Sequence, residues 1–242
     1  MSIPGLDSWN SPLGQYVLAW EQPLIDATVA DIFGYNALQL GLPQLDLLRE
    51  NRIPFRQKAG HPAGDHAVDV LCDLRHLPIA ANSIDLVVLP HVLEFHDDPH
   101  QILREVERVL IPEGQVILTG FNPMSLWGIR RQFAGSNSGF PWQGQYLSAT
   151  RTKDWLQLLG FEVERPVYGC FAPPCRTGKW LRRWQWIDGG EGRGNGIAGG
   201  TYLLRAVKRV QGMRVILPKW KTSARPAKAL TPIAQKETPR GQ

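Results

Sequence analysis

The chain has 242 residues, of which 43% are hydrophobic and 20% are charged, and its formal net charge is +5. This composition excludes an intrinsically disordered chain, and the length suits one α/β domain with short additions. The three cysteines lack metal-ligand spacing, which favours reduced thiols, and the first ten residues do not resemble a signal peptide. We therefore expect a cytoplasmic protein without a membrane span.

The first predicted element follows an N-terminal lead of residues 1–10. Ser11 can cap a helix that begins at Pro12, and apolar residues recur at near-helical spacing as far as Phe33. Pro23 lies inside this pattern, so we expect it to kink or divide the helix. Packing against the core is the simplest role for such a helix.

A first strand is predicted over residues 37–43, and its apolar run meets a glycine at Gly41. Only 26 residues, from Leu42 to Ala67, then remain for a helix, a second strand and their loops. Asp46 and Glu50 are expected on a short helix in this passage. No acidic residue clearly ends the second strand.

Three apolar runs follow, over residues 68–72, 84–89 and 116–118. Near-continuous apolar runs are typical of parallel strands that are buried on both faces. Between the last two runs, Asp98 can cap a helix that begins at Pro99. Its apolar residues fall on one face at helical spacing: Ile102, Leu103, Val106, Val109 and Leu110. Strand, helix and strand in this order predict a right-handed crossover and parallel pairing.

Residues 176–186, in the carboxyl-terminal half, mix arginine with tryptophan. This mixture is typical of a lid helix over a substrate pocket, which we favour, and also of surfaces that grip phosphates and stack bases.

The end of the chain is strongly basic. Residues 208–242 contain nine Lys or Arg and one acid, a net charge of +8, which leaves about −3 for residues 1–207. The prolines and small polar residues of this tail predict a disordered extension over residues 209–242. The functional alternative is an electrostatic arm that binds RNA.

Residues 69–123 carry a resemblance to a known family. Asp73, the Leu77-Pro78 pair, Ile84-Asp85 and the Arg108–Gly114 turn are similar to the carboxyl half of the core of class I S-adenosylmethionine-dependent methyltransferases, in particular the group that includes ubiquinone and menaquinone biosynthesis enzymes. The resemblance implies a Rossmann-like α/β fold over residues 11–208. Residues 154–163 resemble its late helix and strand, with Gly160 as the helix stop, and residues 201–208 resemble its final strand. Its sheet would be mostly parallel and seven-stranded, with helices on both faces and an antiparallel last strand.

The resemblance also implies a cofactor, S-adenosylmethionine, and the residues that bind it. Asp73 would accept from the adenine amine, and the amide of Leu74 would meet a ring nitrogen. Leu40 and Gly41 would lie beside the methionine end. His91 would contact cofactor or substrate and is the candidate catalytic base, with Glu94 and His96 as alternatives nearby.

The sequence departs from the family at the turn after the first strand. The family has an acidic residue and three glycines there, whereas this chain has Gln39, Leu42, Pro43 and Gln44 around a single glycine. Side chains in this turn would narrow the cofactor pocket.

The expected function is therefore methyl transfer from S-adenosylmethionine to a small molecule, or to RNA. Two alternatives stay open: a methyltransferase-shaped binding or scaffold protein with an impaired cofactor site, and an RNA-binding protein that uses its basic tail. We expect no metal, because His91, His96, Asp97 and His100 lack ligand spacing.

Overall fold

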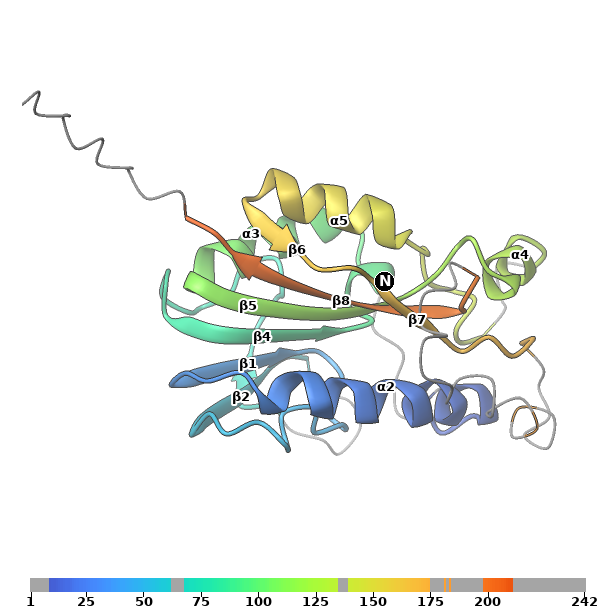
Figure 1. Ribbon diagram of the computed structural model, residues 1–242, viewed down its shortest axis with the longest axis horizontal. Coiled ribbons are helices and arrows are strands. Elements are labelled where there is room, and N and C mark those ends of the chain that lie inside the picture. The colour runs from blue at the N-terminus through green and yellow to red at the C-terminus, as the bar shows by residue number, and fades with distance from the viewer. Residues whose placement is uncertain are drawn as a thin grey trace, which may run out of the picture. The chain divides into compact units, whose positions relative to one another are not determined.

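The computed structural model describes residues 9–61, 68–134, 139–174, 181, 183 and 198–210. They form a sheet with helices on both faces (Figure 1). The elements are α2 (Pro12–Ala30), β1 (Asn36–Leu40), β2 (Phe55–Gly60), β3 (Val70–Leu71), β4 (Ile84–Pro90), the 3-10 helix η1 (Leu93–Phe95), α3 (Pro99–Val109), β5 (Leu110–Phe121), α4 (Leu126–Gln132), α5 (Ala149–Leu158), β6 (Phe161–Val163), β7 (Val167–Gly169) and β8 (Thr201–Lys208).

The order of strands in the sheet is β3-β2-β1-β4-β5-β8-β6, and β7 also pairs with β8. Strands β1 to β5 are parallel, and β8 is antiparallel to each of its neighbours. The predicted fold class, including an antiparallel last strand, is confirmed. The described sheet has eight strands rather than the seven predicted. The segment that pairs with β8 is interrupted at residues 164–166 and so forms two short strands, β6 and β7. Pro166 lies at this interruption and has no amide hydrogen to donate to the neighbouring strand.

Helix α2 covers one face of the sheet (Figure 1). Gly14 N donates to Ser11 Oγ at 3.1 Å, so the predicted cap is present. The helix continues through Pro23 without division. Its buried residues Ile25 and Val29 pack with residues of β1, β4, β5 and β8, and this packing outweighs the hydrogen bond that proline removes.

Helices α3 and α5 cover the opposite face (Figure 1). Asp98 caps α3 as predicted, since its Oδ1 accepts from Gln101 N at 3.0 Å. The apolar face of α3 is fully buried against β4 and β5. Gly160, with φ +86°, ends α5 before β6 begins.

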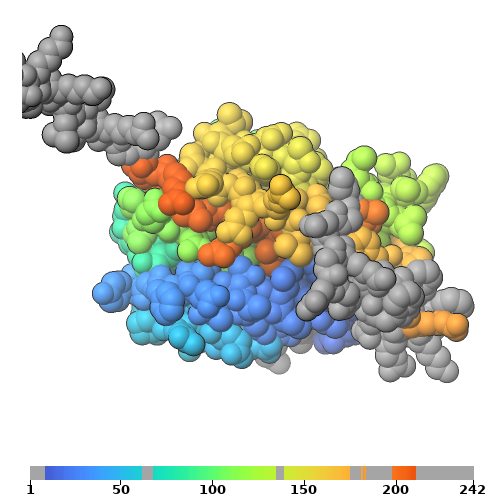
Figure 2. All heavy atoms as spheres, viewed as in Figure 1, coloured from blue at the N-terminus to red at the C-terminus, as the bar shows by residue number. Residues whose placement is uncertain are grey.

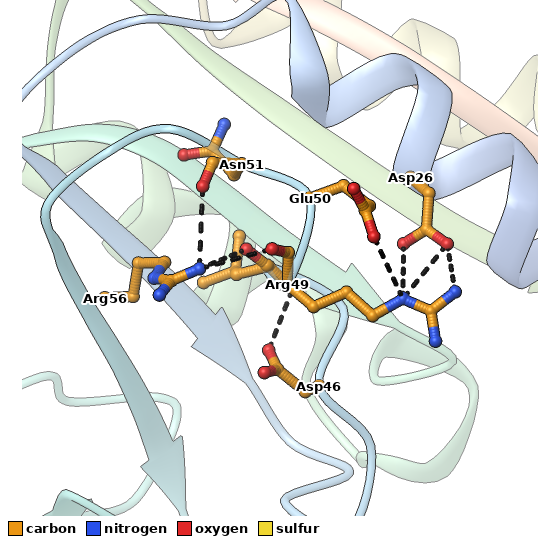
Figure 3. Close-up of polar contacts among 7 residues, drawn as sticks. Asp26, Asp46, Arg49, Glu50, Asn51 and Arg56 are labelled. Atoms are coloured by element: carbon orange, nitrogen blue, oxygen red, sulfur yellow. Dashed lines mark hydrogen bonds and ion pairs between the residues drawn. The ribbon is translucent and has the colours of Figure 1, made fainter.

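The passage between β1 and β2 differs from the prediction. Glu50 lies in a turn and Asp46 directly precedes that turn, so the expected short helix is not formed. Polar contacts hold the passage instead (Figure 3): Arg49 pairs with Asp26 of α2, and Arg56 Nη1 donates to Leu48 O at 3.0 Å. Helix α2 already covers this face of the sheet, so the link between β1 and β2 does not need a helix of its own.

Two predicted features lie outside the described residues. The basic tail is described only as far as Val210, and the Arg-Trp segment only at residues 181 and 183. Among the described residues, no helix has the length and apolar character needed to cross a membrane.

Candidate functional site

The carboxyl ends of β1 and β2 and the turn after β3 converge. Gly41 follows β1 with φ +77°, and its N donates to Ala59 O at 2.9 Å, while Gly60 ends β2 with φ +137°. A methyl group on Gly60 would lie 3.6 Å from Gly41 N and 3.6 Å from Leu74 Cδ2. Ligands of open parallel sheets bind at such ends, and the two glycines allow close approach to the backbone.

The predicted cofactor residues Leu40 and Leu74 have buried side chains, 0% and 2% exposed, that belong to the main hydrophobic core. Their side chains are therefore not available to a ligand at this rim. Cofactor binding by Leu40, Gly41 and Leu74 stays a prediction. The side chains of Leu40 and Leu74 stabilise the rim by packing in the hydrophobic core.

Asp73 lies in the turn after β3, where it bonds to its own loop. Arg75 Nη2 is 2.6 Å from Asp73 Oδ2, and Arg75 N donates to Oδ1 at 2.9 Å. These bonds hold the pKa of the Asp73 carboxyl well below its usual range, so it is ionised at neutral pH. The carboxylate can accept a further hydrogen bond, because each oxygen has two lone pairs and 39% of the side chain is exposed.

Gln39 holds the turn after β1 in shape. Its side chain is fully buried, and Nε2 lies 3.2, 3.0 and 3.1 Å from the carbonyl oxygens of Gly41, Leu42 and Leu45. Its Oε1 accepts from Leu47 N at 3.1 Å. An acidic residue here would face three carbonyl oxygens without a hydrogen to donate, which explains why this chain has an amide at the family's acidic position.

Two side chains of the same turn have different surroundings. Leu42 has φ +45° and is 1% exposed, so it occupies space that a glycine would leave open. The amide of Gln44 is buried, and in the part of the chain that the structure describes neither its nitrogen nor its oxygen has a hydrogen-bond partner. An unpartnered buried amide is costly and is typical of a ligand contact. The sequence indicated only that Gln44 adds bulk to a glycine turn.

His91 lies directly after β4 and is fully buried, with φ +48°. Its Nε2 is 2.8 Å from Glu21 Oε1, and its Nδ1 is 3.0 Å from Glu94 Oε2. Glu94 also accepts from Phe121 N. The structure therefore brings together His91 and its predicted alternative Glu94, and adds Glu21 of α2, which no local sequence signal marked. His96 is separate: its Nδ1 lies 2.8 Å from Val92 O.

The protonation of His91 follows from these contacts. Burial alone would lower its pKa, but the carboxylates of Glu21 and Glu94 outweigh that effect and raise the pKa of His91 to about 10. The imidazole is then a cation that donates from both nitrogens. It has no lone pair for a substrate proton, so this geometry does not suit a general base.

Aromatic side chains surround the ion cluster that Glu21, His91 and Glu94 form. The centroid of the Phe121 ring lies 4.2 Å from that of His91, 5.1 Å from that of Tyr146 and 5.9 Å from that of Phe140. Trp9 lies against His91, with ring centroids 5.1 Å apart. Trp9 Nε1 and Tyr146 Oη are buried and have no hydrogen-bond partner among the described residues. Aromatic side chains therefore pack at the carboxyl ends of β4 and β5, and two of them carry a buried polar atom that has no hydrogen-bond partner among the described residues.

A pocket of about 210 Å³ lies elsewhere, between α2 and the β6–β8 edge of the sheet. Figure 2 shows the atoms of α2, in blue, lying against the yellow and red atoms of that edge. Thr28, Arg165 and Leu203 are among its lining residues, and none of the predicted cofactor residues is. Over the described residues, no group of His, Cys, Asp and Glu side chains is arranged to hold a metal ion.

Known proteins share this architecture. A family model described as a methyltransferase domain matches residues 45–118, a range that includes Asp73, Leu74 and His91 and leaves out Leu40 and Gly41. Two solved S-adenosylmethionine-dependent methyltransferases align over most of the fold: one from Archaeoglobus fulgidus (TM-score 0.54, 15% identity, 80% of this chain and 98% of that chain), and one from Mesorhizobium loti (TM-score 0.52, 14% identity, 79% and 99%). Residues 45–118 thus match the methyltransferase domain family, and the described residues have the class I methyltransferase fold.

Curated relatives are similar to this chain in sequence. The uncharacterized protein YafS of Escherichia coli (strain K12) is 33% identical over 159 residues, 65% of this chain and 65% of that protein. A malonyl-[acyl-carrier protein] O-methyltransferase of Laribacter hongkongensis is 32% identical over 103 residues, 40% of this chain and 34% of that enzyme. The chain thus spans less than two thirds of the length of each of these relatives.

Proposed function

We propose that the protein binds S-adenosylmethionine at the carboxyl ends of β1, β2 and β3 and transfers its methyl group to a small molecule. The observation that carries the proposal is the convergence of Gly41, Gly60 and Leu74 within van der Waals reach of one point. Asp73, ionised and partly exposed, lies one residue before Leu74, where the resemblance expects the adenine contact.

The residues of the rim fit the cofactor at both ends. The two glycines place no side chain at this rim, and a side chain at Gly60 would fill the space between Gly41 and Leu74. The unpartnered amide of Gln44 offers a donor and an acceptor to the amino and carboxylate groups of the methionine end. When bound, S-adenosylmethionine supplies an electrophilic methyl group on a sulfonium. Leu42 narrows this end of the site without removing the polar atoms.

The state of His91 favours one class of methyl acceptor. A nucleophile that must lose a proton needs a base, and His91 holds a proton on each nitrogen between Glu21 and Glu94. An acceptor that is already ionised needs none, and alignment then supplies most of the rate. We therefore propose a small carboxylate as acceptor. The similarity to an enzyme named as an O-methyltransferase supports this choice.

Calorimetric titration with S-adenosylmethionine tests cofactor binding, and we expect saturable binding in the micromolar range. Gln44→Leu, which keeps the volume but removes both polar atoms, should weaken that binding about tenfold. Pro43→Ala in the same turn is the matched control and should change the affinity little. Release of S-adenosylhomocysteine in the presence of a panel of small carboxylic acids then tests transfer.

A second candidate is a methyltransferase-shaped binding protein without turnover. The observation that favours it is the filled turn after β1, where the buried side chains of Gln39 and Leu42 stand at family acid and glycine positions. It predicts no heat of binding with millimolar S-adenosylmethionine, for the wild type and for Leu42→Gly alike. RNA binding by the basic tail stays a prediction, and truncation at Val210 with a salt titration tests it.

A further inference from the structure

Three ionisable side chains are buried together at the end of β4. The side chains of Glu21, His91 and Glu94 are 3%, 0% and 1% exposed. Both carboxylates contact the same imidazole, and among the described residues no lysine or arginine pairs with either of them. With both carboxyl groups ionised and the imidazole protonated, the cluster carries one excess negative charge in the interior.

A net buried charge is strongly unfavourable, because the interior solvates it poorly. Local hydrogen bonds spread this charge in part: Phe121 N donates to Glu94, and Thr119 Oγ1 lies 3.5 Å from Glu21 Oε2. Both donors are neutral. A cation that binds nearby would offset the charge that they leave.

The ion cluster adjoins the expected methionine end of the cofactor. Gln39 pairs with Val88 near the ends of β1 and β4, so the turn after β1 and His91 after β4 follow neighbouring strands at the same edge of the sheet. The ring of Phe121 packs on His91, and Leu42 belongs to the same buried cluster as Phe121 and Trp9. Aromatic faces attract cations, which adds to the effect of the excess negative charge.

We propose that the Glu21–His91–Glu94 cluster makes the site select the cationic cofactor, S-adenosylmethionine, over its neutral product, S-adenosylhomocysteine. This inference rests on the proposed function, because it requires the cofactor to bind at the rim. Glu21 acts here as a specificity-determining residue through the field of the cluster, since it contacts His91 and Thr119. Loss of the methyl group removes the positive charge of the ligand, so the same charge that favours binding before transfer favours release afterwards.

Calorimetry on the full chain with the two ligands tests the inference directly. We expect the wild type to bind S-adenosylmethionine about tenfold more tightly than S-adenosylhomocysteine. Glu21→Gln should bring the ratio of affinities close to one by weakening only the cationic ligand. Asp26→Asn removes the same charge from the same helix at a carboxylate that pairs with Arg49, and it should keep the wild-type ratio.

The outcomes separate this inference from the proposed function. Equal affinity of the wild type for the two ligands, or an undiminished preference in folded Glu21→Gln, overturns the charge selection and leaves cofactor binding intact. Absence of binding by either ligand overturns the proposed function and the inference with it. If Glu21→Gln does not fold, as judged by circular dichroism, Glu94→Gln removes the same charge from the other side of His91 and should have the same effect.

Discussion

His91 Nε2 lies 2.8 Å from Glu21 Oε1, and this contact joins the end of β4 to a helix 70 residues earlier in the chain. Neither side chain is exposed to solvent by more than 3%. The contact therefore fixes α2 against the carboxyl ends of the strands, where the cofactor is expected. We expect both the stability and the proposed ligand selection to depend on this contact.

Replacing His91 by glutamine should destabilise the protein by about 3 kcal/mol, because two buried carboxylates lose their shared cation. Urea unfolding followed by circular dichroism measures the change. His76→Gln is the matched control: His76 is exposed, and its replacement should change the free energy of unfolding by less than about 0.5 kcal/mol. Similar losses for both variants would contradict the structural role of His91.

The stability should fall as pH rises above neutrality. The pKa of His91 is raised to about 10 in the folded protein, above the value of about 6.5 in an unfolded chain. Its stabilisation is therefore complete below pH 6.5 and is lost as pH rises toward 10. Between pH 6.5 and 8.5 we expect the free energy of unfolding to decrease by roughly 2 kcal/mol.

His91→Gln is the control for this pH dependence, since it should abolish the decrease. The pKa of the Cys72 thiol and those of the Tyr146 and Tyr202 phenols are also raised by burial, from ordinary values that lie above this window. A slope that persists unchanged in His91→Gln would assign the pH dependence to other groups.

Gly60→Ala should weaken S-adenosylmethionine binding at least tenfold, because the new methyl group enters the space between Gly41 and Leu74. The substitution also strains a backbone with φ +137°. Gly160→Ala imposes comparable strain, at φ +86°, on the far side of α5, where the methyl group would lie 3.7 Å from Arg209 O. Both variants should lose about 1 kcal/mol or more of stability, and only Gly60→Ala should lose affinity in calorimetry.

Asp73→Asn should lower the affinity for the cofactor and leave the free energy of unfolding almost unchanged. Its ion pair with Arg75 is exposed, so the free energy of unfolding should change by less than about 1 kcal/mol. An amide in place of the carboxylate should weaken cofactor binding about tenfold, since the acceptor of the adenine amine loses its charge. Asp154→Asn, at an exposed acid of α5, should affect neither quantity. Unchanged affinity in Asp73→Asn would mean that this carboxylate serves only its own turn.

The sequence predicted the elements that local signals specify. Helix α3 has its capping Asp98 and a periodic apolar face, and β4 and β8 are apolar runs of the right length. These features depend on residues that are near in sequence, so pattern and capping rules suffice.

The candidate site was less predictable because its contacts are long-range. In the sequence, Glu21 cannot be told from any other polar residue of a helix. Only the packing of α2 on the sheet brings it to His91. The unpartnered amide of Gln44 depends on the three-dimensional course of the turn, which Gln39 holds from within. Pro166 stands in the sequence, but the interruption between β6 and β7 follows only from the way in which both strands pair with β8.

The most direct test of cofactor binding is a crystal structure of the protein grown with S-adenosylmethionine. We expect density for the adenosyl group against Gly41, Gly60 and Leu74, with the adenine amine at the Asp73 carboxylate and the methionine end at the Gln44 amide. Clear density for the ligand at another place, or a turn whose Leu42 side chain fills this space while saturating ligand stays in solution, would contradict it.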